Sequence, residues 1–269
     1  MAWIYLLPAA VLLLGLLAVP LAATLPAGLP LMPQLFGDAS LLQVSGNTLA
    51  FAGITVALEL VLGVLFALLL NQPLRGQGPV RAVAILPWAL PTAVMALAWR
   101  WIFNDTYGIA NDLPVRLGLL SEPVAWLGRP ALAFATIVVA DVWKTTPFVT
   151  ILLLAGLQSV PDDLHEAMRI DGAGPVRRFF WITLPMLRPA IGLAITFRLI
   201  HALGIFDLVW VLTGGGPANA TKTIALYIYD QFFRYGQLAY GAALTIVAAL
   251  AMFVLAGAAG ALIRGRARG

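Results

Sequence analysis

A few ionisable side chains stand inside runs of apolar residues, and they are the groups that could bind a polar solute or do chemistry. They are Glu59, Asp141, Lys144, Arg198, His201 and Asp207. Charged groups in apolar segments are energetically expensive, so each is a functional candidate by default. Asp141 and Lys144 are three residues apart on one helix face and are expected to pair, and Arg198 and His201 repeat that spacing. Two interpretations stay open: a solute path, or structural ion pairs lining a water-filled cavity.

The chain lacks the motifs of common catalytic sites. It has no Gly-x4-Gly-Lys-Ser/Thr sequence, so it cannot bind ATP through a P-loop. It has no cysteine, no His-Glu-x-x-His sequence and only two histidines, His165 and His201, which argues against a catalytic metal. No nucleophile and base stand in a recognisable arrangement. The sequence therefore predicts a protein that is not an enzyme and binds no cofactor itself.

Composition places the chain in the membrane. Of its 269 residues 61% are hydrophobic and 10% are charged, whereas a soluble domain carries roughly a quarter charged residues. Apolar runs of about 20 residues recur, which is typical of helices rather than of a barrel. The fold class is predicted to be all-α integral membrane. The net charge of +4 is attributed to basic residues that set membrane topology, not to nucleic acid.

Six transmembrane helices are predicted within a single permease-like domain that covers residues 1–269. Their approximate limits are 3–25, 47–70, 82–103, 131–157, 190–212 and 239–263. The core of the domain is 47–263, and residues 26–46 are predicted to form a loop. Pro87 and Pro91 are expected to kink the third span, which a helix bundle tolerates. Aromatic residues at 227–235 are expected to form an interfacial helix or belt.

The distribution of basic residues predicts the orientation. Six spans put both termini on one side, together with nine basic residues in the 72–81 turn, the 159–189 loop and the tail. The opposite side carries five. The positive-inside rule then places the termini and the 159–189 loop in the cytoplasm, with the chain in the inner, cytoplasmic membrane of the cell.

The 159–189 loop is the longest polar interruption and is predicted to contain two short helices. Pro161 suits a first helical position, and Asp162 and Asp163 follow it at the positive end of the helix dipole. This helix is expected to run to about Asp171, with Gly172 as a left-handed stop. A second helix is expected to begin at Gly174-Pro175 and return to the membrane.

The same loop resembles the EAA signature of binding-protein-dependent ABC import permeases. Glu166-Ala167-Met168, Gly172 and Ile182-Thr-Leu-Pro185 stand at the spacing of that family. Met168 is the one departure, because the family usually has alanine there. Further similarities cover nearly the whole chain: Asn47-Thr48, Pro161-Asp-Asp163, Phe206-Asp207, Thr213-Gly-Gly-Gly-Pro217 and Tyr235-Gly236. Together they look like the first permease of the carbohydrate branch, of the maltose, trehalose or glycerol-phosphate type.

The resemblance implies a mechanism and partners. The short helix would be a coupling helix that docks on a cytoplasmic ATPase, through Leu164, Glu166, Ala167, Met168, Asp171, Gly172 and Phe179. Two ATPase subunits would bind ATP and Mg, and closing them would drive alternating access. A second permease subunit, an extracytoplasmic solute-binding protein and the lipid bilayer complete the expected partners. The solute would be a sugar, such as a disaccharide.

The resemblance also implies a mid-membrane solute path on either side of the coupling loop. By correspondence, that path includes Asp141, Lys144, Thr145, Phe148, Arg198, His201, Ala202 and Ile205. Glu59 is expected to be a buried, hydrogen-bonded carboxyl, and Asp207 to stabilise the outer end of the fifth span. Two alternatives stay open: import of glycerol phosphate or another small polar solute, and a secondary transporter using Asp141 or Glu59 as a proton relay.

Overall fold

The computed structural model describes residues 7–8, 11–72 and 76–265, and every regular element in these ranges is helical. The start of the predicted first span, Arg75 and residues 266–269 lie outside them. From Leu14 the described chain runs through a π-helical turn (Leu14–Ala18) into α2 (Val19–Gly28) and a 3-10 helix (Leu29–Gly37). The predicted loop at 26–46 is therefore wrong. The prolines suggested a loop, but Pro30 lies in a first helical turn, where proline is tolerated, and Pro26 and Pro33 lie inside helices without ending them.

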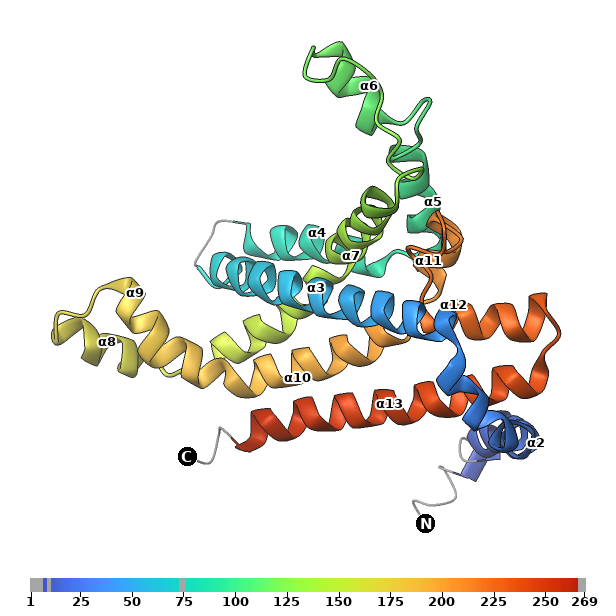
Figure 1. The fold of residues 1–269 in the computed structure, drawn as a ribbon. Coiled ribbons are helices and arrows are strands. Elements are labelled where there is room, and N and C mark those ends of the chain that lie inside the picture. Colours follow the sequence, from blue (N-terminus) through green and yellow to red (C-terminus); the bar gives the residue numbers. More distant parts are fainter. Residues whose placement is uncertain (1–6, 9–10, 73–75, 266–269) are drawn as a thin grey trace.

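Four helices in the described part of the chain are long and apolar enough to cross a membrane. They are α3 (Ala39–Leu70), α7 (Pro130–Gln158), the helical run Pro175–Leu203 that ends in α10 (Leu184–Leu203), and α13 (Leu238–Gly265). Figure 1 shows α3, α10 and α13 lying side by side with α7 crossing them. The limits of α7 and α13 confirm the fourth and sixth predicted spans within two residues.

Close approach between α3 and α7 holds this core together. A Cβ added to Gly63 of α3 would come within 2.6 Å of the Val149 side chain of α7. Ala67 lies one turn further on the same face and is fully buried. Small residues four apart let two membrane helices approach closely, which gains dispersion energy without a hydrophobic driving force. Leu153 and Leu187 complete the apolar cluster between α3, α7 and α10.

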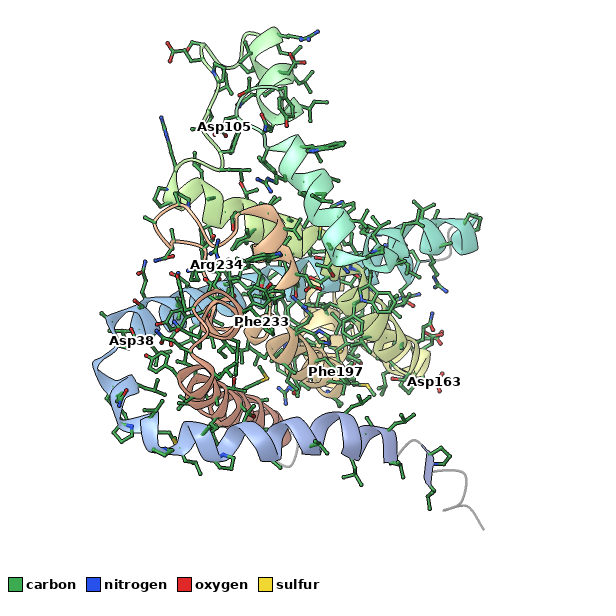
Figure 2. All side chains as sticks on the ribbon, turned by 90° about the vertical axis from the view of Figure 1, so that its right-hand side faces the viewer. Asp38, Asp105, Asp163, Phe197, Phe233 and Arg234 are labelled. Carbon is green, nitrogen blue, oxygen red and sulfur yellow. The ribbon has the colours of Figure 1, made fainter. Side chains whose placement is uncertain are left out.

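The third predicted span is broken rather than kinked. Its two halves, α4 (Gln77–Ala89) and α5 (Thr92–Ile102), meet at 89°. Leu90 between them is extended, with ψ 138°, because the ring of Pro91 disfavours the helical conformation of the residue before it. Pro87 lies inside α4 without ending it. With 13 residues, α4 rises about 20 Å, less than the roughly 30 Å hydrocarbon core. Figure 2 shows Asp105 and the α6 segment (Ile109–Arg116) projecting beyond α5.

The fifth predicted span ends earlier than expected, so the limit at 212 is wrong. α10 stops at Leu203 with Gly204 as its C-cap, and a separate helix α11 (Asp207–Leu212) follows. At the other end, α9 (Pro175–Arg178), a π-helical turn (Phe179–Thr183) and α10 form one helical run.

A polar clamp fixes the end of the bundle opposite α8. Asp38 caps α3 by accepting a 2.8 Å hydrogen bond from the Ser40 amide. It also accepts hydrogen bonds from the hydroxyls of Tyr227 (2.7 Å), in α12 (Ile224–Tyr229), and Tyr240, in α13. Burial opposes ionisation of Asp38, but these hydrogen bonds outweigh it and hold its pKa below the usual value. α12 and the π-helical turn Asp230–Arg234 confirm the helix predicted from the aromatic residues.

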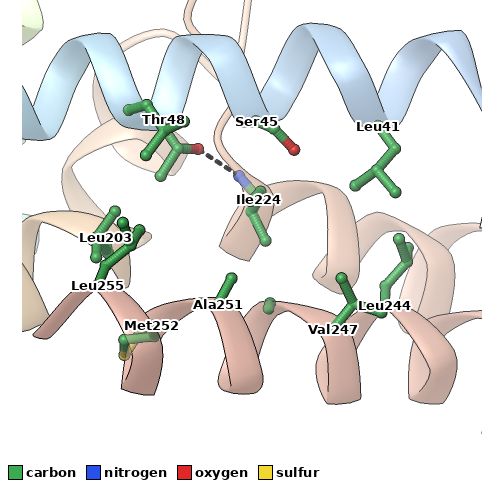
Figure 3. A pocket seen from close by; sticks show the side chains of 12 residues that line it. Leu41, Ser45, Thr48, Leu203, Ile224, Leu244, Val247, Ala251, Met252 and Leu255 are labelled. Carbon is green, nitrogen blue, oxygen red and sulfur yellow. Dashed lines mark hydrogen bonds between the residues drawn. The ribbon is translucent and has the colours of Figure 1, made fainter. Parts of the chain in front are cut away.

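The 213–223 segment is also tied down at this end. Asn47 of α3 donates to the carbonyl oxygens of Asn219 (2.8 Å) and Lys222 (3.0 Å). Lys222 forms a 2.8 Å ion pair with the fully buried Asp230. A small, mostly apolar cavity of about 160 Å³ lies between α3 and α13 (Figure 3). Thr48 and Ile224 line this cavity, and the Thr48 hydroxyl accepts a hydrogen bond from the Ile224 amide.

Candidate functional site

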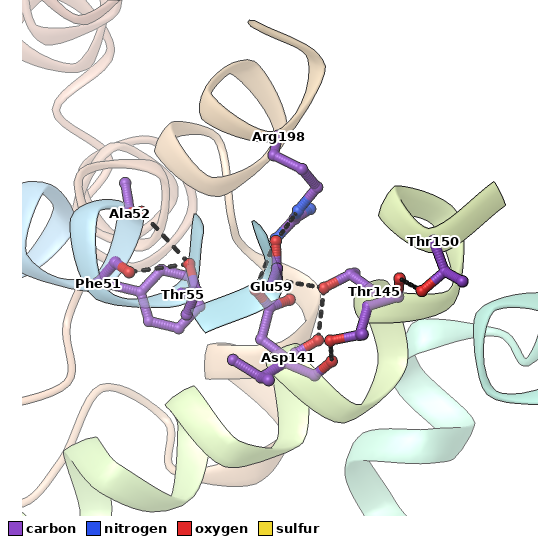
Figure 4. A network of polar contacts seen from close by, with 10 residues as sticks. Phe51, Ala52, Thr55, Glu59, Asp141, Thr145, Thr150 and Arg198 are labelled. Atoms are coloured by element: carbon purple, nitrogen blue, oxygen red, sulfur yellow. Dashed lines mark hydrogen bonds and ion pairs between the residues drawn. The ribbon is translucent and has the colours of Figure 1, made fainter. Parts of the chain in front are cut away.

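One buried ion network joins three of the membrane helices. Arg198 of α10 lies between Glu59 of α3 and Asp141 of α7, and these side chains are 5%, 0% and 3% exposed. Its Nη2 atom donates to Glu59 Oε1 and to Asp141 Oδ2, both at 2.8 Å, and its Nε donates to Glu59 Oε2. Thr145 of α7 donates to Glu59 as well (Figure 4). One guanidinium therefore neutralises one of two buried carboxylates.

Helical geometry explains why these groups meet. Asp141 and Thr145 are four residues apart and share one face of α7. The Thr145 hydroxyl stays close to that face because it contacts the Asp141 carbonyl oxygen at 2.6 Å. Glu59 stands one turn before Gly63 on α3, next to the close approach of α3 and α7. The planar guanidinium of Arg198 presents its N–H donors in a fixed fork, so it bonds Glu59 through two nitrogens and Asp141 at the same time.

The network changes two predictions made from sequence spacing. Asp141 pairs with Arg198 across helices, so the expected Asp141–Lys144 pair within α7 is wrong. Spacing along one helix cannot reveal a partner that a different helix brings closer. Lys144 instead donates to the main-chain oxygen of Trp88 at 3.4 Å. The expectation that Glu59 is a buried, hydrogen-bonded carboxyl is confirmed.

A second group of side chains forms a partly open aromatic surface next to Lys144. Phe148 of α7 stacks on Trp88 of α4 at 5.8 Å between ring centroids and meets Phe197 of α10 edge-on at 6.2 Å. Trp88 and Phe197 are each 46% exposed. Sequence reasoning missed both of these residues. Their aromatic type was the only available signal, because only the fold brings α4 and α10 to Phe148.

The other residues of the predicted path lie elsewhere. His201 is exposed on α10. Ala202 is buried in the apolar core and Ile205 packs against that core, so their part in a solute path stays a prediction. Asp207 is exposed in the first turn of α11. There its charge suits the positive end of that helix, in line with a structural role.

The predicted coupling helix is present as α8 (Asp162–Ile170). Asp162 and Asp163 occupy its first turn, and Pro161 is its N-cap rather than its first residue. At its end Gly172 adopts φ +76°. The amide of Gly172 donates to Arg169 O at 3.1 Å, and that of Ala173 donates to Met168 O at 2.9 Å. This pair of bonds is a Schellman motif, which requires the left-handed residue that Gly172 provides.

No residue of α8 is fully buried, so most of the helix surface is open to a partner. Glu166, Ala167 and Asp171 are exposed, Leu164 is 42% exposed, and Met168 is half-buried. Phe179 lies half-buried against Phe180, with ring centroids 5.1 Å apart. Sequence reasoning missed Ile170, which is 82% exposed at the end of α8. An apolar side chain this exposed would be a natural contact if α8 docks on a partner as predicted.

In the part of the chain that the structure describes, four or five candidate membrane spans carry one exposed amphipathic helix, α8. Residues 59–268 match the family described as binding-protein-dependent transport system inner membrane component. The chain belongs to this family and is an inner-membrane, multi-pass permease of an ABC transporter. The predicted family is confirmed, and membership decides against the secondary transporter.

Several relatives carry names of solute importers. The chain is 48% identical over 200 residues to the trehalose/maltose transport system permease protein MalF of Thermococcus litoralis, covering 74% of this chain and 67% of the relative. It is 40% identical over 273 residues to the sulfoquinovosyl glycerol transport system permease protein SmoG of Agrobacterium fabrum, covering 95% and 88%. A bacterial ABC transporter involved in the import of the acidic polysaccharide alginate has the same fold. That structure gives a TM-score of 0.87 over 98% of this chain and 94% of the other, at 23% identity.

Proposed function

We propose that this permease carries a sugar, such as a disaccharide, from a solute-binding protein into the cytoplasm. The observation that carries the proposal is the surface formed by Trp88, Phe148 and Phe197 beside Lys144. An aromatic face with an adjacent hydrogen-bond donor suits a sugar ring, which has apolar faces and hydroxyl edges. The name of one relative, a trehalose/maltose transport system permease, supports the same solute class.

The proposed path runs along α4, α7 and α10. Lys144 and Phe148 contact the solute directly, and Trp88 and Phe197 join them. Asp141, Thr145 and Arg198 lie behind this surface in the ion network, where they hold the three helices in register. His201, Ala202 and Ile205 become part of the path when the helices move between inward-open and outward-open states.

Glycerol phosphate is the second candidate, and the charge of the site argues against it. An anion needs unpaired cations, and Arg198 is already paired with two carboxylates. Lys144 alone remains, half-buried and bonded to a main-chain oxygen. A neutral or weakly charged sugar fits this balance better.

We further propose that α8 couples transport to ATP hydrolysis in two partner ATPase subunits, which bind ATP and Mg. Glu166 offers a charge to a basic residue of the ATPase, Ala167 allows close approach, and Leu164, Met168 and Phe179 supply apolar contact. Asp171 and Gly172 form the turn that fixes the angle of the helix. A second permease subunit forms the other half of the pathway. This chain crosses the membrane six times, with both termini in the cytoplasm.

Transport by the reconstituted complex tests the proposal. The permease is assembled in vesicles with its second permease, ATPases and solute-binding protein, and uptake of a labelled disaccharide is compared with uptake of glycerol phosphate. We expect ATP-dependent uptake that the disaccharide saturates. Saturation by glycerol phosphate alone would move the solute assignment to the second candidate, and uptake without ATP would contradict the coupling mechanism.

A further inference from the structure

A large groove separates α3 from α4 and has α7 as its floor. It encloses about 890 Å³, within the roughly 300–1,000 Å³ range of small-molecule sites. Its walls include Leu62 and Phe66 of α3, Val83 and Ala84 of α4, and Trp143 of α7. This groove lies outside the aromatic surface and the ion network described above.

Polar groups are rare in the described lining of the groove. Thr146 and Thr150 belong to it, but their hydroxyls contact the carbonyl oxygens of Val142 (2.6 Å) and Thr146 (2.9 Å) in their own helix. Threonines bonded in this way present only their methyl groups. The other polar side chains of the described lining are Trp143, with its indole N–H, and Arg81, which is the one charged group among them.

Arg81 lies at the end of the groove where α3 stops. Its Nη2 donates to the carbonyl oxygen of Leu70, the last residue of α3, at 3.0 Å. Its Nε is buried and has no hydrogen-bond partner among the described atoms. No described carboxylate forms an ion pair with it. An uncompensated guanidinium with a free buried donor calls for an anionic acceptor.

The dimensions of the groove match one leaflet of a bilayer. Its lining on α3 extends from Leu58 to Leu70, which corresponds to about 18 Å along the helix axis. One leaflet of hydrocarbon is about 15 Å thick. Figure 1 shows the last turn of α3 and the first turn of α4 at the end of the bundle that carries α8 and α9. Arg81 therefore stands at the height of lipid head groups on that side.

We propose that this groove binds an anionic phospholipid, with its acyl chains between α3 and α4 and its phosphate on Arg81. Basic pockets between membrane helices recognise anionic head groups in this way. A membrane helix of a partner subunit is a poorer occupant. Membrane spans rarely carry the anion that Arg81 lacks, whereas the phosphate of an anionic phospholipid supplies it.

Lipid binding to the assembled transporter tests the proposal, whatever its solute. The complex is purified in mild detergent, stripped of lipid and titrated with phosphatidylglycerol or phosphatidylcholine, and bound lipids are counted by native mass spectrometry. Arg81→Gln should weaken phosphatidylglycerol binding about five-fold and leave phosphatidylcholine unchanged. Arg188→Gln, which removes an exposed arginine of α10, is the matched control and should bind as the wild type does.

Two further variants keep the test decisive if Arg81→Gln does not fold. Arg81→Lys should retain the preference for phosphatidylglycerol, and Ala84→Phe should displace both lipids by filling the groove. Unchanged lipid binding in Ala84→Phe would overturn the proposal. A complex that binds inorganic phosphate at this site but no phospholipid would also overturn it. Because the chain has no cysteine, Val83→Cys can also be cross-linked to single cysteines in the second permease. Efficient cross-linking there would place a partner helix in the groove instead.

Discussion

Removing Arg198 should be among the most damaging single changes in this protein. The variant Arg198→Met keeps a similar length and apolar stem but removes the cation that bonds Glu59 and Asp141. Both carboxylates are buried, at 0% and 3% exposure, and would then repel each other without a counter-charge. Breaking a buried ion pair by removing one partner costs about 3–5 kcal/mol.

This cost can be measured as thermal stability in detergent. At about 2–4 °C per kcal/mol for a chain of this size, Arg198→Met should lower the unfolding midpoint by about 6–20 °C. The triple variant Glu59→Gln, Asp141→Asn, Arg198→Met removes the charge imbalance and should recover most of that loss, because neutral groups replace a buried ion network at little net cost.

Comparing solute uptake by the Arg198→Met variant and by the triple variant also shows whether the ion network is structural or contacts the solute. We expect the triple variant to regain stability and to keep measurable solute uptake, since the aromatic surface beside Lys144 is untouched. An Arg198→Met protein as stable as the wild type would refute the ion network as described. A triple variant that is stable yet shows no solute binding would instead place Arg198 or its partners in contact with the solute.

Three other outcomes are expected. Gly172→Leu should uncouple ATP hydrolysis from transport while the chain still inserts, because φ +76° costs an L-residue about 1–2 kcal/mol. The control Gly174→Ala, at φ −68° with open space around it, should couple normally. Equal coupling in both variants would exclude a fixed turn. Trp88→Ala should raise the solute concentration for half-maximal uptake at least several-fold. Trp101→Ala, which changes an exposed residue outside the aromatic surface, should leave it unchanged. The same increase in both variants would indicate general damage rather than a solute contact. Asp38→Asn should keep the cap but cost about 1 kcal/mol of stability at neutral pH, because the hydrogen bonds from the Tyr227 and Tyr240 hydroxyls lose their charged acceptor. Because the folded pKa of Asp38 is lowered, that difference should persist at neutral pH and shrink only below about pH 4, and a difference that stays constant down to pH 2 would contradict the clamp.

The sequence by itself determined the class of protein and the place of helix α8. Long apolar runs can only be membrane helices, since every backbone polar group must be satisfied within the segment. Helix α8 was predictable because its signals are local: Asp162 and Asp163 at the start, and Gly172 at the stop. Local chemistry decides such a turn without help from distant residues.

Tertiary structure decided what depends on several helices at once. The sequence could not show that Leu90 and Pro91 separate two helices at 89°, because proline permits either a kink or a break and neighbouring helices choose between them. It named Glu59, Asp141 and Arg198 as candidates but not as partners, since the contacts span up to 139 residues of chain. The contacts of Trp88 and Phe197 with Phe148 could not be predicted for the same reason. Spacing along a helix predicts which residues share a face, and only packing decides what that face meets.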